Sequence, residues 1–355
     1  MFSARFLPLL LLTSVYWLNA APRAQFIFEK APFPSCHAST ILEASPGEFL
    51  AAWFGGREEG ANDVAIWGAR LTKGGWSEPF EMVRETNTPA WNPVLFAAAD
   101  GTIWLYYKFG PSPQTWTAGR RASRDGGRTW LAPEHLPAGV YGPIKDKPLV
   151  LGDGTIVSGT SVESYLSWSC WVEVSRDNGK TWTRHGPIMP EGPAPAKPLA
   201  PMTLAAVPGS EYWHRTHGII QPAVVPLGAK RIRMFVRATQ DIGRICYSDS
   251  TDGGVTWTPA KATALPNPNS GIDAVGLRDG RIAMVYNHTR RGRTPLNIAV
   301  SRDGDHWNNF LALETEPGEF SYPAIIQARD GSLHVTYTWN RKKIKHVVVP
   351  LEEVP

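Results

Sequence analysis

The chain has 355 residues, a formal net charge of +4 and 43% hydrophobic residues, which is ample for a sizeable core. So small a charge, without a run of Lys or Arg, does not favour a nucleic-acid or membrane-surface partner. The three cysteines, Cys36, Cys170 and Cys246, form no pairing motif, which indicates buried apolar side chains rather than a disulfide framework. Metal-binding and nucleotide-binding motifs do not occur, so we expect no metal and no cofactor.

Residues 1–21 have the pattern of a secretory signal peptide. Arg5 precedes a largely apolar stretch over residues 6–18, and a small-residue cleavage context follows. Pro8 and the shortness of this stretch disfavour a transmembrane helix. We therefore expect an exported protein, secreted or periplasmic, whose mature part, residues 22–355, is a single domain without a membrane span and a monomer.

One short phrase, Ser-Xaa-Asp followed by Gly or Asn, Gly and a closing Trp, recurs four times. The copies span residues 123–130, 175–182, 250–257 and 301–307, and the last is one residue shorter. Asp, Asn and Gly favour a tight hairpin turn, and the Trp is suited to pack between sheets. The aspartates of these turns are expected to be structural and far from any site: Asp125, Asp177, Asp252 and Asp303.

A second repeat places a turn before an apolar strand six times. Its glycines are separated by 54, 53, 74, 52 and 51 residues and lie at Gly47, Gly101, Gly154, Gly228, Gly280 and Gly331. Regular units of about 40–50 residues are typical of propeller blades. The sequence therefore predicts an all-β fold, a six-bladed β-propeller, in preference to a β-sandwich. The long interval contains a proline-rich segment at 190–198, which is expected to be a surface loop.

A polar or ionisable residue stands just before an apolar strand in each of the six units. These residues are candidates for a site because the first strand of a propeller blade faces the central axis. They are His37, Asn92, the Lys145–Lys147 group, Gln221, Asp273 and Tyr322.

The four phrases, the six-fold unit and the order of three further segments resemble the sialidase (neuraminidase) superfamily, over essentially the whole mature chain. The segments are Asn-Pro-Asn-Ser-Gly-Ile-Asp at 267–273, Gly-Glu-Phe-Ser-Tyr-Pro-Ala-Ile-Ile at 318–326 and His-Val-Thr-Tyr-Thr-Trp-Asn-Arg at 334–341. They are most similar to the bacterial "predicted neuraminidase" branch.

This resemblance implies a glycoside hydrolase in which three arginines grip a substrate carboxylate. A Tyr nucleophile activated by a Glu, and an Asp acid/base, complete the set. Guanidinium forks bind carboxylates bidentately and keep their charge. By position, Arg237 and Arg293 match the second and third arginines, although Arg290 or Arg291 could take the place of Arg293. Tyr322 matches the nucleophile.

The acid/base Asp of the family falls near Asp63, with Arg57 on the same loop of the first blade. Two positions depart from the family pattern: His37 stands where the first arginine is expected, and Gln221 where the Glu is expected. Gln cannot act as a general base. Either water, positioned by Gln221 and Tyr322, attacks with inversion while Asp63 acts as acid, or His37 titrates near neutrality as base or carboxylate ligand.

Two further candidates could contact substrate hydroxyl groups: His288 and Glu163. Three tryptophans are possible sugar-stacking platforms, although a core role is the simpler interpretation: Trp91, Trp116 and Trp168.

The leading hypothesis is an exo-acting glycoside hydrolase that releases a terminal acidic sugar, such as sialic acid, from glycans. One alternative is a uronate-directed polysaccharide lyase that uses His37 and Tyr322. The other is a non-catalytic propeller that binds sialosides.

Overall fold

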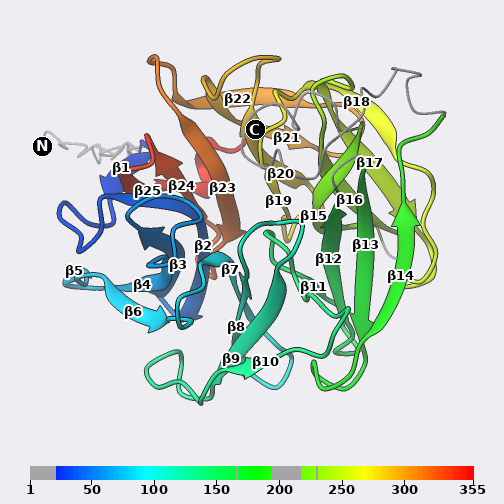
Figure 1. Ribbon diagram of the computed structural model, residues 1–355. Coiled ribbons are helices and arrows are strands. Elements are labelled where there is room, and N and C mark those ends of the chain that lie inside the picture. Colours follow the sequence, from blue (N-terminus) through cyan, green and yellow to red (C-terminus); the bar gives the residue numbers. More distant parts are fainter. Residues whose placement is uncertain (1–20, 165–166, 193–216, 229–230) are drawn as a thin grey trace, which may run out of the picture.

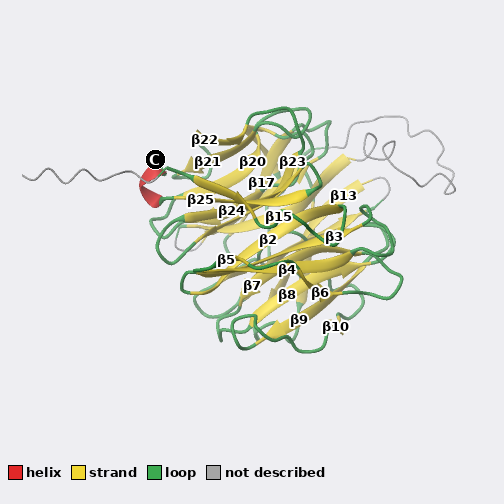
Figure 2. Cartoon of the chain, turned by 90° about the vertical axis from the view of Figure 1, so that its left-hand side faces the viewer, coloured by secondary structure: helices red, strands yellow, loops and turns green. Residues whose placement is uncertain are grey.

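The computed structural model describes residues 21–164, 167–192, 217–228 and 231–355. These residues form strands and loops with no α-helix; a single 3-10 turn, η1 (Leu351–Glu353), lies near the C-terminus (Figure 2). The expected signal peptide, except for Ala21, lies outside the described residues, as does most of the proline-rich segment. Among the described residues, no helix has the length and hydropathy needed to cross a membrane.

The first two sheets come from the N-terminal third of the chain. One has the order β2-β3-β4-β5, with β6 also paired to β4: β2 (Ser35–Ser45), β3 (Glu48–Gly56), β4 (Ala65–Thr72), β5 (Gly75–Trp76) and β6 (Phe80–Val83). The next has the order β7-β8-β9-β10: β7 (Ala90–Ala97), β8 (Ile103–Phe109), β9 (Thr117–Ser123) and β10 (Glu134–His135).

The middle of the chain forms two antiparallel meanders that join into an eight-stranded sheet. The first meander consists of β11 (Leu149–Val150), β12 (Ile156–Glu163), β13 (Ser167–Ser175) and β14 (Thr183–Ile188). The second consists of β15 (His217–Leu227), β16 (Arg231–Ala238), β17 (Arg244–Ser250) and β18 (Lys261–Pro266). A two-residue parallel pairing between β13 and β15 connects them.

The last two sheets contain the C-terminal third and one strand from the N-terminus. One has the order β19-β20-β21-β22: β19 (Asp273–Gly276), β20 (Ile282–Asn287), β21 (Leu296–Ser301) and β22 (Asn308–Glu314). The other has the order β1-β25-β24-β23: β1 (Arg23–Phe26), β23 (Phe320–Gln327), β24 (Leu333–Trp339) and β25 (Lys343–Val349).

The two ends of the chain meet in this last sheet. β1 pairs antiparallel with β25, and the blue and red ribbons lie side by side in Figure 1. The first strands of four pairs of units contact one another: β2 with β7, β15 with β19, β19 with β23, and β23 with β2. β15 also contacts β12, the second strand of the unit before it. The first strands of five units therefore lie next to one another in the order β7, β2, β23, β19 and β15.

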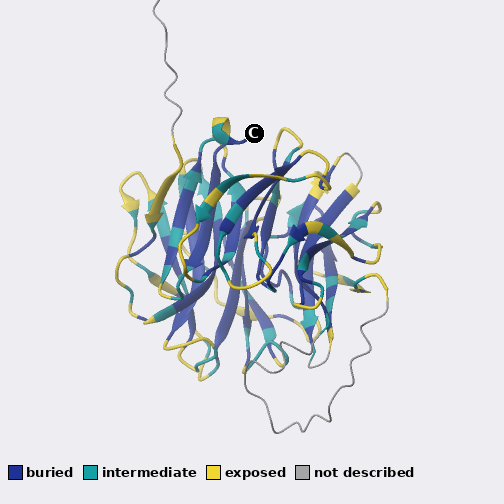
Figure 3. Ribbon diagram, turned by 90° about the horizontal axis from the view of Figure 1, so that it is seen from above, coloured by how far each residue is buried: buried dark blue, intermediate teal, exposed yellow. Residues whose placement is uncertain are grey.

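Apolar side chains fill the spaces between neighbouring sheets, and the buried strands lie inside a rim of exposed loops (Figure 3). One cluster joins Val285 and Ile298 of one sheet to Ile325 and Val335 of the next. The three cysteines are buried and free, as the sequence predicts. Burial raises the pKa of the Cys246 thiol to about 12.

The four repeated phrases form hairpin turns, which confirms that prediction. In the first, the Ser123 hydroxyl donates to Asp125 at 2.8 Å, and Asp125 accepts backbone N–H groups of Arg128 and Thr129 at 3.0 and 2.9 Å. The Trp130 indole N–H donates to the Gly127 carbonyl at 3.1 Å. The six turns of the second repeat each follow the first strand of a unit, and all six glycines have positive φ.

Candidate functional site

The inner strands are bent where the polar residues of the sequence pattern lie. Register shifts interrupt β2, β7, β15 and β23, and each places a residue in the left-handed region: Ala38 (φ 57°), Asn92 (φ 34°), Gln221 (φ 57°) and Tyr322 (φ 50°). Asn269, just before β19, has φ 60°. Such conformations are unfavourable for residues other than Gly and concentrate at functional sites, where bulges re-aim side chains.

The Tyr322 hydroxyl is the hub of the resulting cluster. Its oxygen accepts hydrogen bonds from Gln221 Nε2 at 3.0 Å and from Arg237 Nη1 at 2.9 Å. Arg237 Nη1 also lies 3.3 Å from Gln221 Oε1, which fixes the orientation of the amide. Arg237 Nε donates to Asn269 Oδ1 at 2.6 Å. Four residues from three units therefore converge, as the sequence hypothesis requires for Gln221, Arg237 and Tyr322.

Arg293 approaches the same tyrosine from the connection between β20 and β21. The guanidinium carbons of Arg237 and Arg293 each lie 5.9 Å from the centroid of the Tyr322 ring. Arg293 Nη1 is buried and donates to no described residue. Burial, reinforced by the charge of Arg237, lowers the pKa of Arg293 to about 10, so the group stays charged at neutral pH. A buried, charged donor without a partner is suited to an anionic ligand.

Arg341 is a third guanidinium, which the sequence hypothesis did not include. It lies in the turn between β24 and β25 with φ 58°, and its Nε donates to Glu319 Oε1 at 2.7 Å while Nη1 pairs with Glu59. Its charge acts on both His37 and Arg293. The sequence contained a signal for this arginine. Arg341 lies ten residues after the turn glycine of its unit, Gly331, and Arg237 lies nine residues after Gly228, so the two occupy similar positions in their units.

His37 belongs to the cluster as a neutral ring. It is buried, Nδ1 lies 3.0 Å from Thr338 Oγ1, and its ring centroid lies 4.1 Å from that of Tyr322. Burial, followed by the charges of Arg341 and Arg293, holds the pKa of His37 well below its usual range. The expectation that His37 titrates near neutrality therefore does not hold, because burial and the nearby positive charges both favour the neutral ring.

Glu163 ends β12 beside this cluster. It is 5% exposed, and its carboxyl group makes no hydrogen bond with any described residue. Burial raises the pKa of Glu163 to about 7, with Arg237 opposing the shift and Glu59 adding to it. A buried carboxyl group can therefore hold a proton near neutral pH next to the arginines.

Asp63 and Arg57 lie on the exposed connection between β3 and β4. Asp63 Oδ2 accepts the backbone N–H of Arg57 at 3.1 Å, and neither side chain bonds to the Tyr322 cluster. The residue of this connection that does reach the cluster is Glu59, through Arg341. Sequence reasoning did not single out Glu59, because its role depends on a partner 282 residues away.

The remaining candidates are held elsewhere or buried. His288 is exposed and contacts Tyr286 and Asn309, neither of which belongs to the cluster. The three tryptophans are buried: Trp91 (6% exposed), Trp116 (7%) and Trp168 (1%). The centroid of the Trp168 ring lies 5.7 Å from the guanidinium carbon of Arg237.

Lys145 packs against the face of the Tyr322 ring, with Nζ 5.9 Å from the ring centroid. Its ammonium donates to Asp146 at 2.6 Å and to the carbonyls of Ile272 and Pro323 at 2.5 and 2.6 Å. Because Pro323 follows Tyr322, this buried ammonium helps to hold the tyrosine in its left-handed conformation. Lys145 is thus a structural centre that joins three units.

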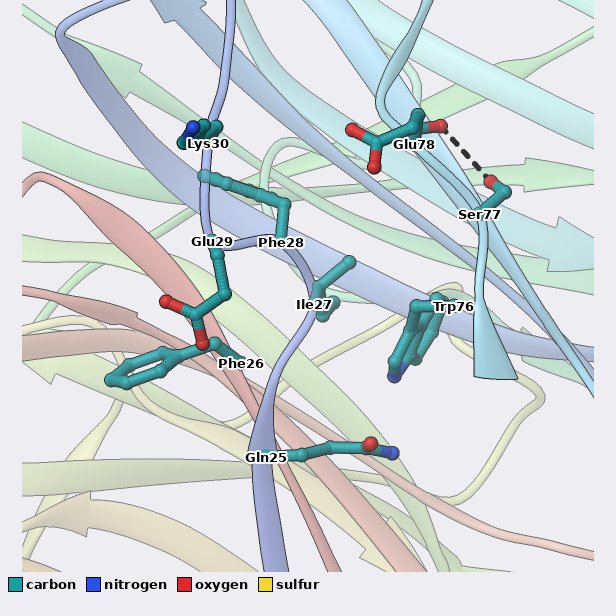
Figure 4. A pocket seen from close by; sticks show the side chains of 9 residues that line it. All are labelled: Gln25, Phe26, Ile27, Phe28, Glu29, Lys30, Trp76, Ser77 and Glu78. Carbon is teal, nitrogen blue, oxygen red and sulfur yellow. Dashed lines mark hydrogen bonds between the residues drawn. The ribbon is translucent and has the colours of Figure 1, made fainter. Parts of the chain in front are cut away.

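A hollow of about 410 Å³ lies apart from the cluster, where β1 meets β5 (Figure 4). The N-terminal residues 25–30 and residues 76–78 line it. None of the Tyr322 cluster lines it. The described residues contain no group of three or more His, Cys, Asp or Glu placed to hold a metal ion.

The profile of the BNR repeat-like domain family matches residues 47–335. The chain belongs to this family. No curated protein matches the chain.

Three solved structures illustrate the fold. A Dyadobacter fermentans protein of unknown function has 16% identity and a TM-score of 0.73, over 92% of this chain and 98% of that chain. The NanB sialidase of Streptococcus pneumoniae has 13% identity and a TM-score of 0.69, over 93% and 71%. A leech intramolecular trans-sialidase, complexed with 2,7-anhydro-Neu5Ac, has 12% identity and a TM-score of 0.69, over 93% and 70%. The fold is therefore all-β and sialidase-like.

Proposed function

We propose that this protein is an exo-acting glycoside hydrolase that releases a terminal acidic sugar, such as sialic acid, from glycans. The observation that carries the proposal is the convergence of Arg237 and Arg293 on Tyr322, with Arg293 Nη1 buried and unpaired. Arg341 adds a third positive charge from another unit. Converging guanidinium groups select a carboxylate over a neutral sugar.

The chemistry that fits this cluster is a single displacement by water. The amide of Gln221 donates to Tyr322 and accepts from Arg237, and it has no basic site to take the tyrosine proton. Gln221 and Tyr322 instead position a water molecule at the anomeric carbon. Direct attack by water inverts the anomeric configuration.

The proposal extends to the architecture and to the destination of the protein. The six antiparallel meanders are six blades of a propeller, closed by the pairing of β1 with β25 and the contact of β2 with β23. The signal-like sequence at residues 1–21 directs export to the periplasm or the medium. A single domain of this kind acts as a monomer on glycoproteins, glycolipids or polysaccharides.

The experiment is hydrolysis of an aryl sialoside by the purified protein and by Arg237→Ala and Arg293→Ala. Loss of one charged fork from a buried site is expected to lower kcat/KM by about 100-fold or more, equivalent to about 3 kcal/mol. Arg293→Lys is the matched control: it keeps the charge without the fork and is expected to recover only part of the activity. Activity indifferent to both alanine variants would exclude the proposal.

A second function is favoured by the contact between neutral His37 and Tyr322, whose ring centroids are 4.1 Å apart. In a uronate lyase, such a pair removes the proton next to the carboxylate while the glycosidic bond breaks and a carbon–carbon double bond forms. An ultraviolet-absorbing unsaturated product from a uronate polysaccharide, with no hydrolysis of sialosides, would identify a lyase. Sialoside binding without turnover would identify a lectin-like protein.

A further inference from the structure

The strand that carries Glu163 points it toward the catalytic cluster. In a β-strand, alternate residues share one face, so Gly159, Ser161 and Glu163 lie on the same side of β12. That side faces β15: Ser161 Oγ accepts the backbone N–H of Gln221 at 3.4 Å, and a Cβ on Gly159 would lie 2.6 Å from the Pro222 carbonyl oxygen. Glu163 is the next residue on this face after Ser161. It lies at the end of β12, close enough to Arg237 for the charge of the arginine to act on it.

The surroundings of Glu163 are suited to a proton donor. The charged and titratable groups that act on it are Arg237 of β16, Glu59 of the β3–β4 connection and the buried thiol of Cys170. Glu59 pairs with Arg341, whereas Glu163 is 5% exposed as a residue and its carboxyl group bonds to no described residue. Two carboxyl groups of the same site therefore stand in opposite environments, one ion-paired and one desolvated, which is the arrangement that separates acid from base roles.

We propose that Glu163, rather than Asp63, is the general acid of the hydrolysis, an inference that rests on the proposed function. The Glu163 carboxyl proton passes to the glycosidic oxygen as the bond from that oxygen to the anomeric carbon breaks, and the leaving group departs as an alcohol. The oxygen of one water molecule bonds to the anomeric carbon and releases its proton to solvent. Solvent then returns a proton to the Glu163 carboxylate.

Asp63 is less suited to this role because of its exposure. Its carboxylate accepts a backbone N–H of its own loop and faces solvent, and it makes no hydrogen bond to the described residues of the Tyr322 cluster. The two assignments therefore predict different variants to be impaired, which makes Asp63→Asn the natural comparison.

The test compares Glu163→Gln with the wild type on aryl and alkyl sialosides whose leaving groups differ in basicity. A general acid matters most for a basic leaving group, so kcat is expected to fall at least 100-fold with an alkyl leaving group and less than 10-fold with 4-nitrophenolate. The alkaline limb of the kcat profile near pH 7 is expected to disappear in the variant. Glu352→Gln, on the exposed C-terminal turn, serves as the control for an unrelated carboxyl substitution.

Several outcomes would overturn the proposal. If Asp63→Asn shows the leaving-group dependence and Glu163→Gln does not, the acid is Asp63 while the proposed hydrolase stands. If the wild type hydrolyses no sialoside, both proposals fail together. Independently of turnover, the difference between the infrared spectra of the wild type and Glu163→Gln at pH 6 is expected to contain the band of a protonated carboxyl group. The difference is needed because burial also raises the pKa of Asp146 to about 7, so that Asp146 contributes such a band to both proteins. A difference spectrum without this band overturns the proposal.

Discussion

Individual residues decide the chemistry around the Tyr322 hydroxyl. In the family that the sequence resembles, a Glu would stand beside this tyrosine, whereas Gln221 donates its amide proton to it. Arg237 supplies a second donor to the same oxygen. The tyrosine oxygen therefore accepts two hydrogen bonds, and no carboxylate of the described residues bonds to it, which suits the positioning of water better than nucleophilic attack.

Replacement of Tyr322 by Phe distinguishes these two roles. If water is the nucleophile, Tyr322→Phe removes one positioning group and leaves two donors unpaired, and kcat is expected to fall about 10- to 100-fold. Loss of a covalent nucleophile would lower kcat by about 10⁴-fold or more. The measurement is kcat on an aryl sialoside, with the anomer formed first identified by NMR. Retention of configuration together with complete loss of activity would contradict the single-displacement mechanism.

The part of this site that sequence reasoning could reach was set by local pattern. Gln221 and Tyr322 stand just before apolar strands of the repeat, Arg237 and Arg293 were implied by the resemblance to the sialidase family, and the structure brings all four together. Arg341 and Glu59 were not predicted as site residues, because they reach the site through an ion pair between distant parts of the chain. The neutral state of His37 could not be predicted either, because it depends on burial and on three arginines that are distant from His37 in the sequence.

At the scale of the structural element, the hairpin turns are stabilised by their ionised aspartates. Hydrogen bonds from the hydroxyl and backbone of Thr256 lower the pKa of Asp252 to about 2, and Thr181 does the same for Asp177. Their folded-state pKa values lie below the unfolded value of about 4. The stabilisation is therefore fully present above pH 4 and is lost as the pH falls toward 2.

Replacement of Asp252 by Asn is expected to lower the melting temperature at pH 7, because the amide accepts fewer hydrogen bonds than the carboxylate. The decline of melting temperature between pH 4 and pH 2 is expected to be shallower in this variant than in the wild type. Circular dichroism at several pH values measures both effects, with Glu352→Gln as the reference. Parallel pH profiles for wild type and Asp252→Asn would show that the turn does not depend on the charge.

The sequence predicted these turns well because their conformation is determined within eight residues. Gly126 and Gly127 both have positive φ, and Asp125 is bonded to groups no more than four positions away. The pairing of β1 with β25 was beyond such reasoning, since a short strand of four residues carries little pattern and its partner lies more than 300 residues later.

At the scale of the whole molecule, β1 connects the start of the chain to its end. Beyond the strand, Ile27 and Phe28 are buried, and the Phe28 ring stacks on Trp53 with centroids 5.1 Å apart. The same short segment therefore contributes to the last sheet and to the core beside the first sheet.

Removal of residues 21–28 is expected to destabilise the fold by about 3–6 kcal/mol, since burial of each large apolar side chain contributes about 1.5–3 kcal/mol. Urea unfolding of the truncated and complete proteins measures the loss. Removal of residues 21 and 22 alone, which precede the strand and are exposed, is the control. An unchanged unfolding midpoint in the longer truncation would mean that β1 is dispensable.

Arg341 connects the first unit to the last: its carbonyl accepts the backbone N–H of Cys36, and its guanidinium binds Glu59. The anion clamp that we propose, formed by Arg237, Arg293 and Arg341, thus depends on the seam between the first and last units. Warming that loosens this seam disturbs the clamp while every sheet is still intact, so inactivation should precede the melting of secondary structure, and a bound acidic sugar should delay both.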